Sequence, residues 1–264
     1  MKPSECESKW PIPKFDENVQ PHFLFIITPP YSGSTALSGL LNSSHRTMIL
    51  QETGEGQWLI PGLCEKDRWC PDKEINYLSI KAVWLSKFQE IKRLTHNVDV
   101  VIEKSPPNMM RIEKLSSQFK NHSFIANNRN PYANCASILY REHDVENVDS
   151  EQRIRILSKL ADDWIKRSQK IRELVLRLNI PLITYEDFCH DPSSILNKLE
   201  LPYGVSDTIN PKAKVKVKDY KFQGIFNQNR RQISYLKKEE IKHLNNILNT
   251  NEELLFFYGY HVLN

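Results

Sequence analysis

Groups that bind anions follow three separate apolar runs of this sequence. The loop TPPYSGST (residues 28–35) carries Gly33 among hydroxyl side chains, Lys104 closes the run VDVVIEK, and Arg129 follows the run HSFIAN. Glycine lets a backbone approach a ligand closely, and a guanidinium grips a phosphate through two parallel hydrogen bonds. These residue types predict the binding of one compact ligand with two separated phosphate groups.

The loop at residues 28–35 differs from the Walker A pattern of nucleoside-triphosphate enzymes. That pattern, G-x-x-x-x-G-K-[ST], would need a glycine where Thr28 stands and a lysine where Ser34 stands. An ATP-dependent small-molecule kinase is therefore the weaker alternative. The simpler interpretations left open are a merely capped helix at Ser34, a surface arginine at 129 and a solvated lysine at 104.

Strands that alternate with helices would bring these positions to one edge of a sheet. Continuous apolar runs predict buried strands at 22–28, 98–104, 122–127 and 180–188. Capping residues and apolar periodicity predict helices at 34–42, after Ser105, after Asn130, from Ser150, at 191–201, twice within 50–96, and in the last third of the chain. The alternation predicts an α/β fold with a central parallel sheet, whose ligands bind at the carboxyl ends of the strands.

Composition limits the class of protein. The 264 residues, 40% of them hydrophobic, fit a single domain over 22–264 preceded by an extended arm over 1–21. The net charge of +4 comes from scattered lysines and arginines, which favours a small anionic ligand over a nucleic-acid polymer. Cys64 and Cys70 would pair only in an oxidising compartment, and no histidine cluster accompanies them, so no metal site is predicted.

No part of the sequence resembles a membrane-crossing or secretory segment. No apolar run approaches the ~18 residues that a membrane span needs, and the polar N-terminus lacks the apolar core of a signal peptide. The sequence therefore predicts a cytoplasmic protein. The alternative is the soluble, lumenal domain of a trimmed Golgi-type protein.

Five segments, taken in order, resemble the PAPS-dependent sulfotransferases, where PAPS is 3′-phosphoadenosine 5′-phosphosulfate. They are TPPYSGSTAL, EKSPPNMMRIEKLSSQF, FIANNRNPYANCAS, ITYEDFCHDPSSIL and the tail GIFNQNRRQISYLKKEEI…FFYGY. The resemblance implies a P-loop-like three-layer fold with helices on either side of the central sheet. It also implies transfer of a sulfuryl group from PAPS to a hydroxyl or amine acceptor, with release of 3′,5′-ADP.

The resemblance also implies which residues bind the nucleotide. The first loop would hold the 5′-phosphosulfate, the third strand and its helix the 3′-phosphate, and a late loop would cover the nucleotide beside an adenine contact. The residues at these positions are Ser32, Gly33, Ser34, Thr35 and Ala36 in the first loop, Arg129 and Ser137 at the 3′-phosphate, Tyr185 at the adenine, and Gln223, Gly224, Asn227 and Asn229 in the late loop.

One position of the first loop departs from the family pattern. The family usually has arginine or lysine just before S-G-[ST]-[ST], to neutralise charge on the leaving phosphate, and this chain has Tyr31 there. Tyr31 still belongs to the predicted nucleotide-binding loop. Lys104 of the EKSPP segment is the candidate replacement for the missing cation.

A carboxylate near the cavity would serve as the general base that a hydroxyl or amine acceptor needs. Residues 51–63, QETGEGQWLIPGL, offer Glu52 and Glu55. Glu55 is preferred, because tyrosylprotein sulfotransferases place their base in a similar GEE…IP stretch. Glu103 and His143 are weaker candidates for the base, and the simplest interpretation is that both glutamates of this stretch merely face solvent.

The sequence leaves the acceptor open among small molecules, glycans and peptides. Segments 50–96 and 141–150 lie between the nucleotide motifs and are expected to determine specificity for the acceptor. Three tryptophans are candidates to line its site: Trp58, Trp69 and Trp84. A protein that binds the nucleotide but has lost the reaction is the alternative function, because Tyr31 replaces the expected cation.

Overall fold

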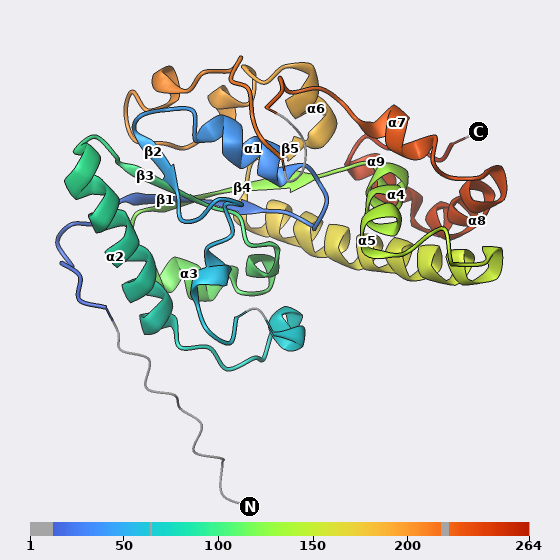
Figure 1. Ribbon diagram of the computed structural model, residues 1–264, viewed down its shortest axis with the longest axis horizontal. Coiled ribbons are helices and arrows are strands. Elements are labelled where there is room, and N and C mark those ends of the chain that lie inside the picture. The colour runs from blue at the N-terminus through green and yellow to red at the C-terminus, as the bar shows by residue number, and fades with distance from the viewer. Residues whose placement is uncertain (1–12, 64, 218–221, 264) are drawn as a thin grey trace, which may run out of the picture.

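A five-stranded parallel sheet lies at the centre of the structure, a computed structural model that describes residues 13–63, 65–217 and 222–263 (Figure 1). Every pair of neighbouring strands is parallel, in the order β2-β3-β1-β4-β5. The strands are β1 (His22–Ile27), β2 (Thr47–Ile49), β3 (Val100–Glu103), β4 (His122–Asn128) and β5 (Leu182–Thr184). The predicted α/β fold with a parallel sheet is therefore confirmed.

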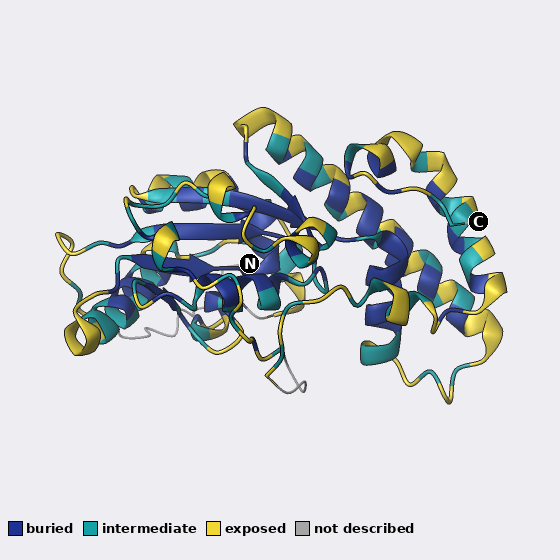
Figure 2. Ribbon diagram, turned by 90° about the horizontal axis from the view of Figure 1, so that it is seen from above, coloured by how far each residue is buried: buried dark blue, intermediate teal, exposed yellow. Residues whose placement is uncertain are grey.

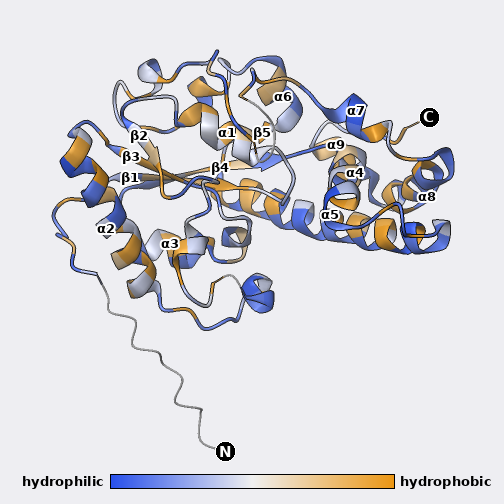
Figure 3. Cartoon of the chain, in the orientation of Figure 1, coloured by the Kyte–Doolittle hydropathy of each residue, from blue (hydrophilic) through white to orange (hydrophobic). Residues whose placement is uncertain are grey.

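Both faces of the sheet are buried, as the apolar strand sequences require. Successive side chains of a strand point to opposite faces. In β1, Phe23 and Phe25 pack into the core on one face, while Leu24 and Ile26 pack into the core on the other. Figure 2 shows the strands almost wholly buried, and Figure 3 shows hydrophobic colour along much of the sheet.

Helices cover the two faces and extend past one end of the sheet. The core of one face takes in side chains of α1 (Ser34–Leu41) and α6 (Tyr185–His190). The core of the other face takes in α2 (Tyr77–Thr95), α3 (Ile112–Gln118) and α5 (Ser150–Leu178). Figure 1 shows the remaining helices gathered beside α5 at the right: α4 (Pro131–Glu142), α7 (Asn229–Ile233), α8 (Lys238–Leu248) and α9 (Glu252–Phe257).

The predicted set of strands needs two corrections: one strand is shorter than predicted, and one strand was missed. The strand predicted over 180–188 ends at Thr184, whose hydroxyl accepts a hydrogen bond from the Asp187 N–H and so begins α6 at Tyr185. Strand β2 was not predicted, because three residues form too short a run to show alternation.

The helix predictions are wrong in three places. After β3, Ser105 does not cap a helix, because its hydroxyl donates to Glu103. A 3₁₀ turn over Pro106–Met110 follows, and α3 begins only at Ile112. Residues 191–201 form turns with a short 3₁₀ segment at Leu196–Lys198. The Asp191 carboxylate accepts the N–H groups of Ser193 and Ser194, as a helix N-cap would, but no α-helix follows. Residues 50–96 hold one α-helix, α2, and two 3₁₀ turns.

The predicted N-terminal arm is described only from residue 13. Its backbone contacts α2, because the Gln89 amide donates to the carbonyls of Asp16 and Val19 at 2.7 and 2.9 Å. The division of the chain at residue 22 stays a prediction. In the described ranges, no helix combines the length and apolar character required to cross a bilayer.

Candidate functional site

One cavity joins the three strand ends that carry anion-binding groups. It lies at the carboxyl ends of β1, β3 and β4 and has a volume of about 290 Å³. Most of the predicted site residues line it, namely Tyr31, Gly33, Ser34, Thr35, Ala36, Glu55, Lys104, Arg129, Ser137, Tyr185, Gln223 and Gly224. The parallel topology thus gathers groups from distant parts of the chain into one site.

Gly33 occupies a position that no other residue fits. Its φ of 82° lies in the left-handed region, and a Cβ built on it would stand 2.2 Å from Cδ2 of Tyr185. The Tyr185 ring is held from the other end, since its hydroxyl donates to the Phe226 carbonyl (3.2 Å) and accepts from the Gln228 N–H (3.1 Å). The loop backbone therefore lies directly against a fixed aromatic ring.

Helix α1 begins at the cavity wall. Gly33 is its N-cap and offers no capping side chain, while Ser34, Thr35 and Ala36 line the cavity. The first N–H groups of a helix have no acceptor inside the helix, and the dipole makes this end positive. The arrangement suits an anion at the first turn of α1.

Arg129 places a buried positive charge against the Tyr185 ring. Its guanidinium lies 4.1 Å from the centre of the Tyr185 ring and donates to the Tyr31 carbonyl (3.1 Å) and to Oδ1 of Asn229 (2.9 Å). It also donates to the side-chain oxygen of Gln232. Burial lowers the pKa of Arg129. Because each of these hydrogen-bond partners is neutral, an anionic ligand would meet a positive charge that no directly bonded carboxylate cancels.

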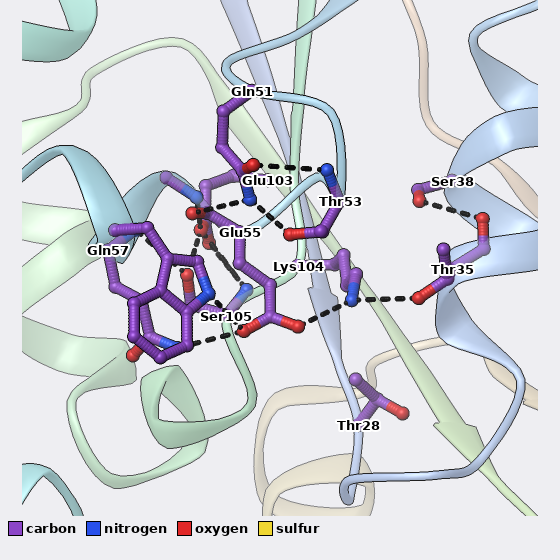
Figure 4. Close-up of polar contacts among 12 residues, drawn as sticks. Thr28, Thr35, Ser38, Gln51, Thr53, Glu55, Gln57, Glu103, Lys104 and Ser105 are labelled. Atoms are coloured by element: carbon purple, nitrogen blue, oxygen red, sulfur yellow. Dashed lines mark hydrogen bonds and ion pairs between the residues drawn. The ribbon is translucent and has the colours of Figure 1, made fainter. Parts of the chain in front are cut away.

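Lys104 and Glu55 form an ion pair beside the first loop (Figure 4). Nζ of Lys104 lies 2.7 Å from Oε1 of Glu55 and 3.1 Å from the hydroxyl of Thr35. The other carboxylate oxygen of Glu55 accepts from the Gln57 amide and the Trp58 indole, both at 3.0 Å. A cation and a carboxylate therefore stand side by side at the start of α1.

Glu103 anchors the loop that carries Glu55 to the end of β3. Its buried carboxylate accepts from the Gly56 N–H (2.9 Å), from the N–H (3.1 Å) and hydroxyl of Ser105, and from the Asn108 amide (Figure 4). Burial raises the pKa of Glu103 to about 7, against the opposing effect of these hydrogen bonds. Glu103 itself does not line the cavity, so it is not placed to act as the base.

Several predicted site residues lie elsewhere. The side chain of Glu52 is 87% exposed and approaches Lys216 at 3.9 Å, away from the cavity. Ser32 is buried, and its hydroxyl accepts from the Asn134 amide at 3.3 Å. Asn227 does not line the cavity, and Asn229 reaches it only through its bond to Arg129.

His143 and Trp84 are also separated from the cavity. His143, a candidate base, follows the last residue of α4 and is absent from the cavity wall. Trp84 is buried in the core, where its indole donates to the Gly56 carbonyl, whereas Trp58 and Trp69 do line the cavity. Cys64 lies outside the described residues, so its pairing with Cys70 stays a prediction.

Among the residues of the cavity wall that were missed from the sequence, three make polar contacts at the site or carry charge. Gln232 bonds Arg129 and approaches the Ser137 hydroxyl at 3.4 Å, and its place one helical turn after Asn229 was the signal for it. Glu142, which accepts from the Tyr31 hydroxyl, and Arg68 gave no such signal. Within the part of the chain that the structure describes, no three His, Cys, Asp or Glu side chains gather to hold a metal ion.

The sequence profile of the Sulfotransferase family matches residues 21–206, which include the first loop, the Lys104 segment, Arg129 and Ser137. The chain belongs to the Sulfotransferase family. A search of curated proteins found no match.

Solved sulfotransferase structures share the fold of this family member. A sulfotransferase domain from the curacin biosynthetic pathway is 17% identical, with 92% of this chain and 99% of that chain covered and a TM-score of 0.52. A sulfotransferase from Mycobacterium avium is 12% identical, with 92% and 78% covered and a TM-score of 0.53. The sulfotransferase domain of the Synechococcus PCC 7002 olefin synthase is 16% identical, with 89% and 98% covered and a TM-score of 0.52. At these identities the likeness shows the fold.

Proposed function

We propose that this protein transfers a sulfuryl group from PAPS to a hydroxyl or amine acceptor and releases 3′,5′-ADP. Family membership supports the reaction class. The observation that carries the proposal is the single cavity lined by both Gly33 and Arg129, with Lys104 and Glu55 in the same wall. Two anion-binding groups that both lie against one aromatic ring match an adenosine that bears phosphate at both ends.

The residues at the cavity fit such a nucleotide. The first turn of α1 supplies N–H groups and hydroxyls for the 5′ end, where Gly33 leaves no room for a side chain. Arg129, with Ser137 beside it, supplies charged donors for the 3′-phosphate. The segment that contains Gln223 and Gly224 closes the same cavity over Tyr185.

PAPS supplies the sulfuryl group: a bond forms between its sulfur and the acceptor atom while the bond from sulfur to the bridging phosphate oxygen breaks. Glu55 takes the proton that the acceptor loses. Lys104 stabilises the negative charge that develops on the leaving oxygen, together with the N–H groups of α1.

Nucleotide binding and transfer test the proposal together. We expect titration calorimetry to detect 3′,5′-ADP binding at micromolar concentrations and ATP–Mg²⁺ binding to be much weaker. Labelled PAPS should then transfer its label to a member of a panel of alcohols, phenols, sugars, amines and tyrosine peptides. Absence of 3′,5′-ADP binding would overturn the proposal, and a preference for ATP–Mg²⁺ would favour a kinase.

A nucleotide-binding protein without transferase activity is the second candidate. Tyr31 favours it, because its hydroxyl bonds Glu142 where the family usually has a cation. The Lys104 ammonium, 3.1 Å from Thr35, favours the enzyme instead. Tight 3′,5′-ADP binding without transfer to any acceptor would identify the second candidate.

A further inference from the structure

The half of the cavity away from Arg129 combines indole surface with positive charge. Trp58 and Trp69 line it together with Pro106 and Pro107, and Arg68 lies in the same wall. If the proposed function is correct, the nucleotide occupies the half between Gly33 and Arg129, and this other half receives the acceptor. The chemistry of its wall then indicates the class of acceptor.

Trp58 joins the aromatic surface to the proposed base. Its indole N–H donates to Oε2 of Glu55 at 3.0 Å, yet 51% of the residue is exposed. A ring laid flat on this indole would gain stacking or C–H contacts, as aromatic rings and sugar faces both do. A hydroxyl on that ring would then lie close to Glu55.

Arg68 adds a positive charge beside the same indole. Its guanidinium lies 5.5 Å from the centre of the Trp58 ring, and among the described residues no carboxylate pairs with it. The two acidic residues of its own turn, Glu65 and Asp67, both bind Lys73 instead. The charge of Arg68 therefore remains available to a ligand.

The backbone of the Arg68 turn is anchored. The buried Arg111 donates to the carbonyls of Arg68 and Pro107, and so ties this turn to the 3₁₀ turn after β3. Burial lowers the pKa of Arg111. A fixed backbone limits the entropy lost when the Arg68 side chain binds an anion.

The carboxylate nearest to Trp58 is already engaged. Glu55 accepts from the Trp58 indole and pairs with Lys104. The cavity wall around Trp58 is therefore aromatic, and Arg68 is its cation without a carboxylate partner among the described residues.

We infer that the acceptor is an anionic ring compound: its ring stacks on Trp58, its hydroxyl reaches Glu55, and its carboxylate or sulfate binds Arg68. An acidic sugar and a hydroxyaryl acid share this chemistry. Arg68 is then a specificity-determining residue for the acceptor. A neutral ring would keep the stacking and lose the charged hydrogen bond.

Paired compounds that share a ring and differ in whether they carry a carboxylate test the inference. The sugar pair is 4-nitrophenyl glucuronide and 4-nitrophenyl glucoside, and the phenol pair is 4-hydroxyphenylacetate and its methyl ester. Calorimetry would measure the binding of each compound to the protein saturated with 3′,5′-ADP. We expect the charged member of one pair to bind about tenfold or more tightly than its neutral partner, as a charged hydrogen bond provides.

Variants test whether Arg68 causes the preference for the charged compound. Arg68→Gln should remove most of it, and Arg68→Lys should retain part. Arg155→Gln removes an exposed positive charge on α5, paired with Glu151, and should leave the preference unchanged. Circular dichroism and the unfolding midpoint show whether each variant is folded.

The outcomes separate this inference from the proposed function. A protein that fails to bind 3′,5′-ADP removes the proposed function first. If 3′,5′-ADP binds but neither charged compound is preferred, or if folded Arg68→Gln keeps the preference, this inference alone is wrong. A preference for the charged compound in either pair supports the inference. The pair that shows it identifies whether the acceptor ring is a sugar or an aryl group.

Discussion

Gly33 and Tyr185 lie so close together that the loop conformation and the proposed nucleotide binding depend on the same atoms. The glycine combines a left-handed φ with a Cβ direction that points into the Tyr185 ring. The loop sequence SGST suggested close backbone approach to a ligand, but it could not reveal that a tyrosine far along the chain fills the space above the glycine. Substitution of Gly33 can separate the cost of backbone strain from the cost of the contact with Tyr185.

Gly33→Ala should lower the free energy of unfolding by about 1 kcal/mol or more from backbone strain alone, with an added cost from the contact with Tyr185. Gly259→Ala is the matched control, because Gly259 has a φ of 73° and open space around its Cβ position. Urea unfolding of both variants measures the difference. An equal loss in the two variants would show that the contact with Tyr185 costs nothing.

Glu55→Gln should leave 3′,5′-ADP binding intact and lower the transfer rate by a factor of about 100 or more, because an amide cannot accept the acceptor's proton. Glu52→Gln is the control, since the Glu52 side chain is 87% exposed and outside the cavity. Single-turnover transfer from labelled PAPS measures both. An unchanged rate in Glu55→Gln would remove this residue from the role of base.

At the scale of elements, the end of β3 positions the loop that carries the proposed base. Glu103, the last residue of β3, lies outside the cavity wall and binds the N–H of Gly56, next to Glu55. Lys104, the residue after the strand, lines the cavity, so two neighbouring residues have separate roles. The sequence predicted the position of Lys104, but it indicated Glu103 only as a weaker candidate for the base and gave no sign of its anchoring role.

The raised pKa of Glu103 predicts how stability changes with pH. Its ordinary pKa is 4.5 and its folded pKa is about 7, so the folded state holds a proton that the unfolded state has lost between these values. The resulting stabilisation is complete below about pH 4.5 and disappears as the pH rises through 7. The difference corresponds to about 3 kcal/mol.

Glu103→Gln removes this titration while it keeps an acceptor oxygen for Gly56. We expect the free energy of unfolding to fall less steeply in the variant than in the parent protein between about pH 5 and pH 8. Urea unfolding at several pH values provides the measurement. Parallel curves for the two proteins would contradict the raised pKa.

The sequence predicted an element well where neighbouring residues determine it, and poorly where tertiary contacts determine it. Long apolar runs and the amphipathic pattern of α5 depend on neighbouring residues, and their positions were predicted well. Strand β2 and the boundary at Tyr185 depend on tertiary contacts, namely pairing with β3 and capping by Thr184. Arg68 enters the cavity from a segment whose position no local pattern specifies.

At the scale of the whole molecule, the cavity lies where the sheet meets the helices of the C-terminal part. Arg129 follows β4 and binds Asn229 and Gln232 of α7, while the Trp164 indole of α5 donates to the Arg129 carbonyl at 2.9 Å. Two parts of the chain about a hundred residues apart thus converge on one guanidinium. The nucleotide would bind across this junction and not within either part.

Arg129→Ala should weaken 3′,5′-ADP binding by about 2 kcal/mol or more, the cost of losing a charged hydrogen-bond partner. It should also reduce the increase in unfolding temperature that 3′,5′-ADP produces, because ligand stabilisation depends on affinity. Arg155→Ala, which removes an exposed charge from α5, is the control. Calorimetry and thermal unfolding with and without 3′,5′-ADP provide both values, and undiminished affinity would exclude Arg129 from the site.

The indole of Trp58 makes the protein its own spectroscopic probe. About half of Trp58 is exposed to water, and its indole N–H donates a hydrogen bond to the Glu55 carboxylate. Indole emission shifts with local polarity and with the charge of a bonded neighbour, so fluorescence should report both the arrival of a ring on its face and the proton gained by Glu55. The chain contains five tryptophans, and Trp58→Phe would identify its share of the signal. Stopped-flow emission could then follow each turnover without any label.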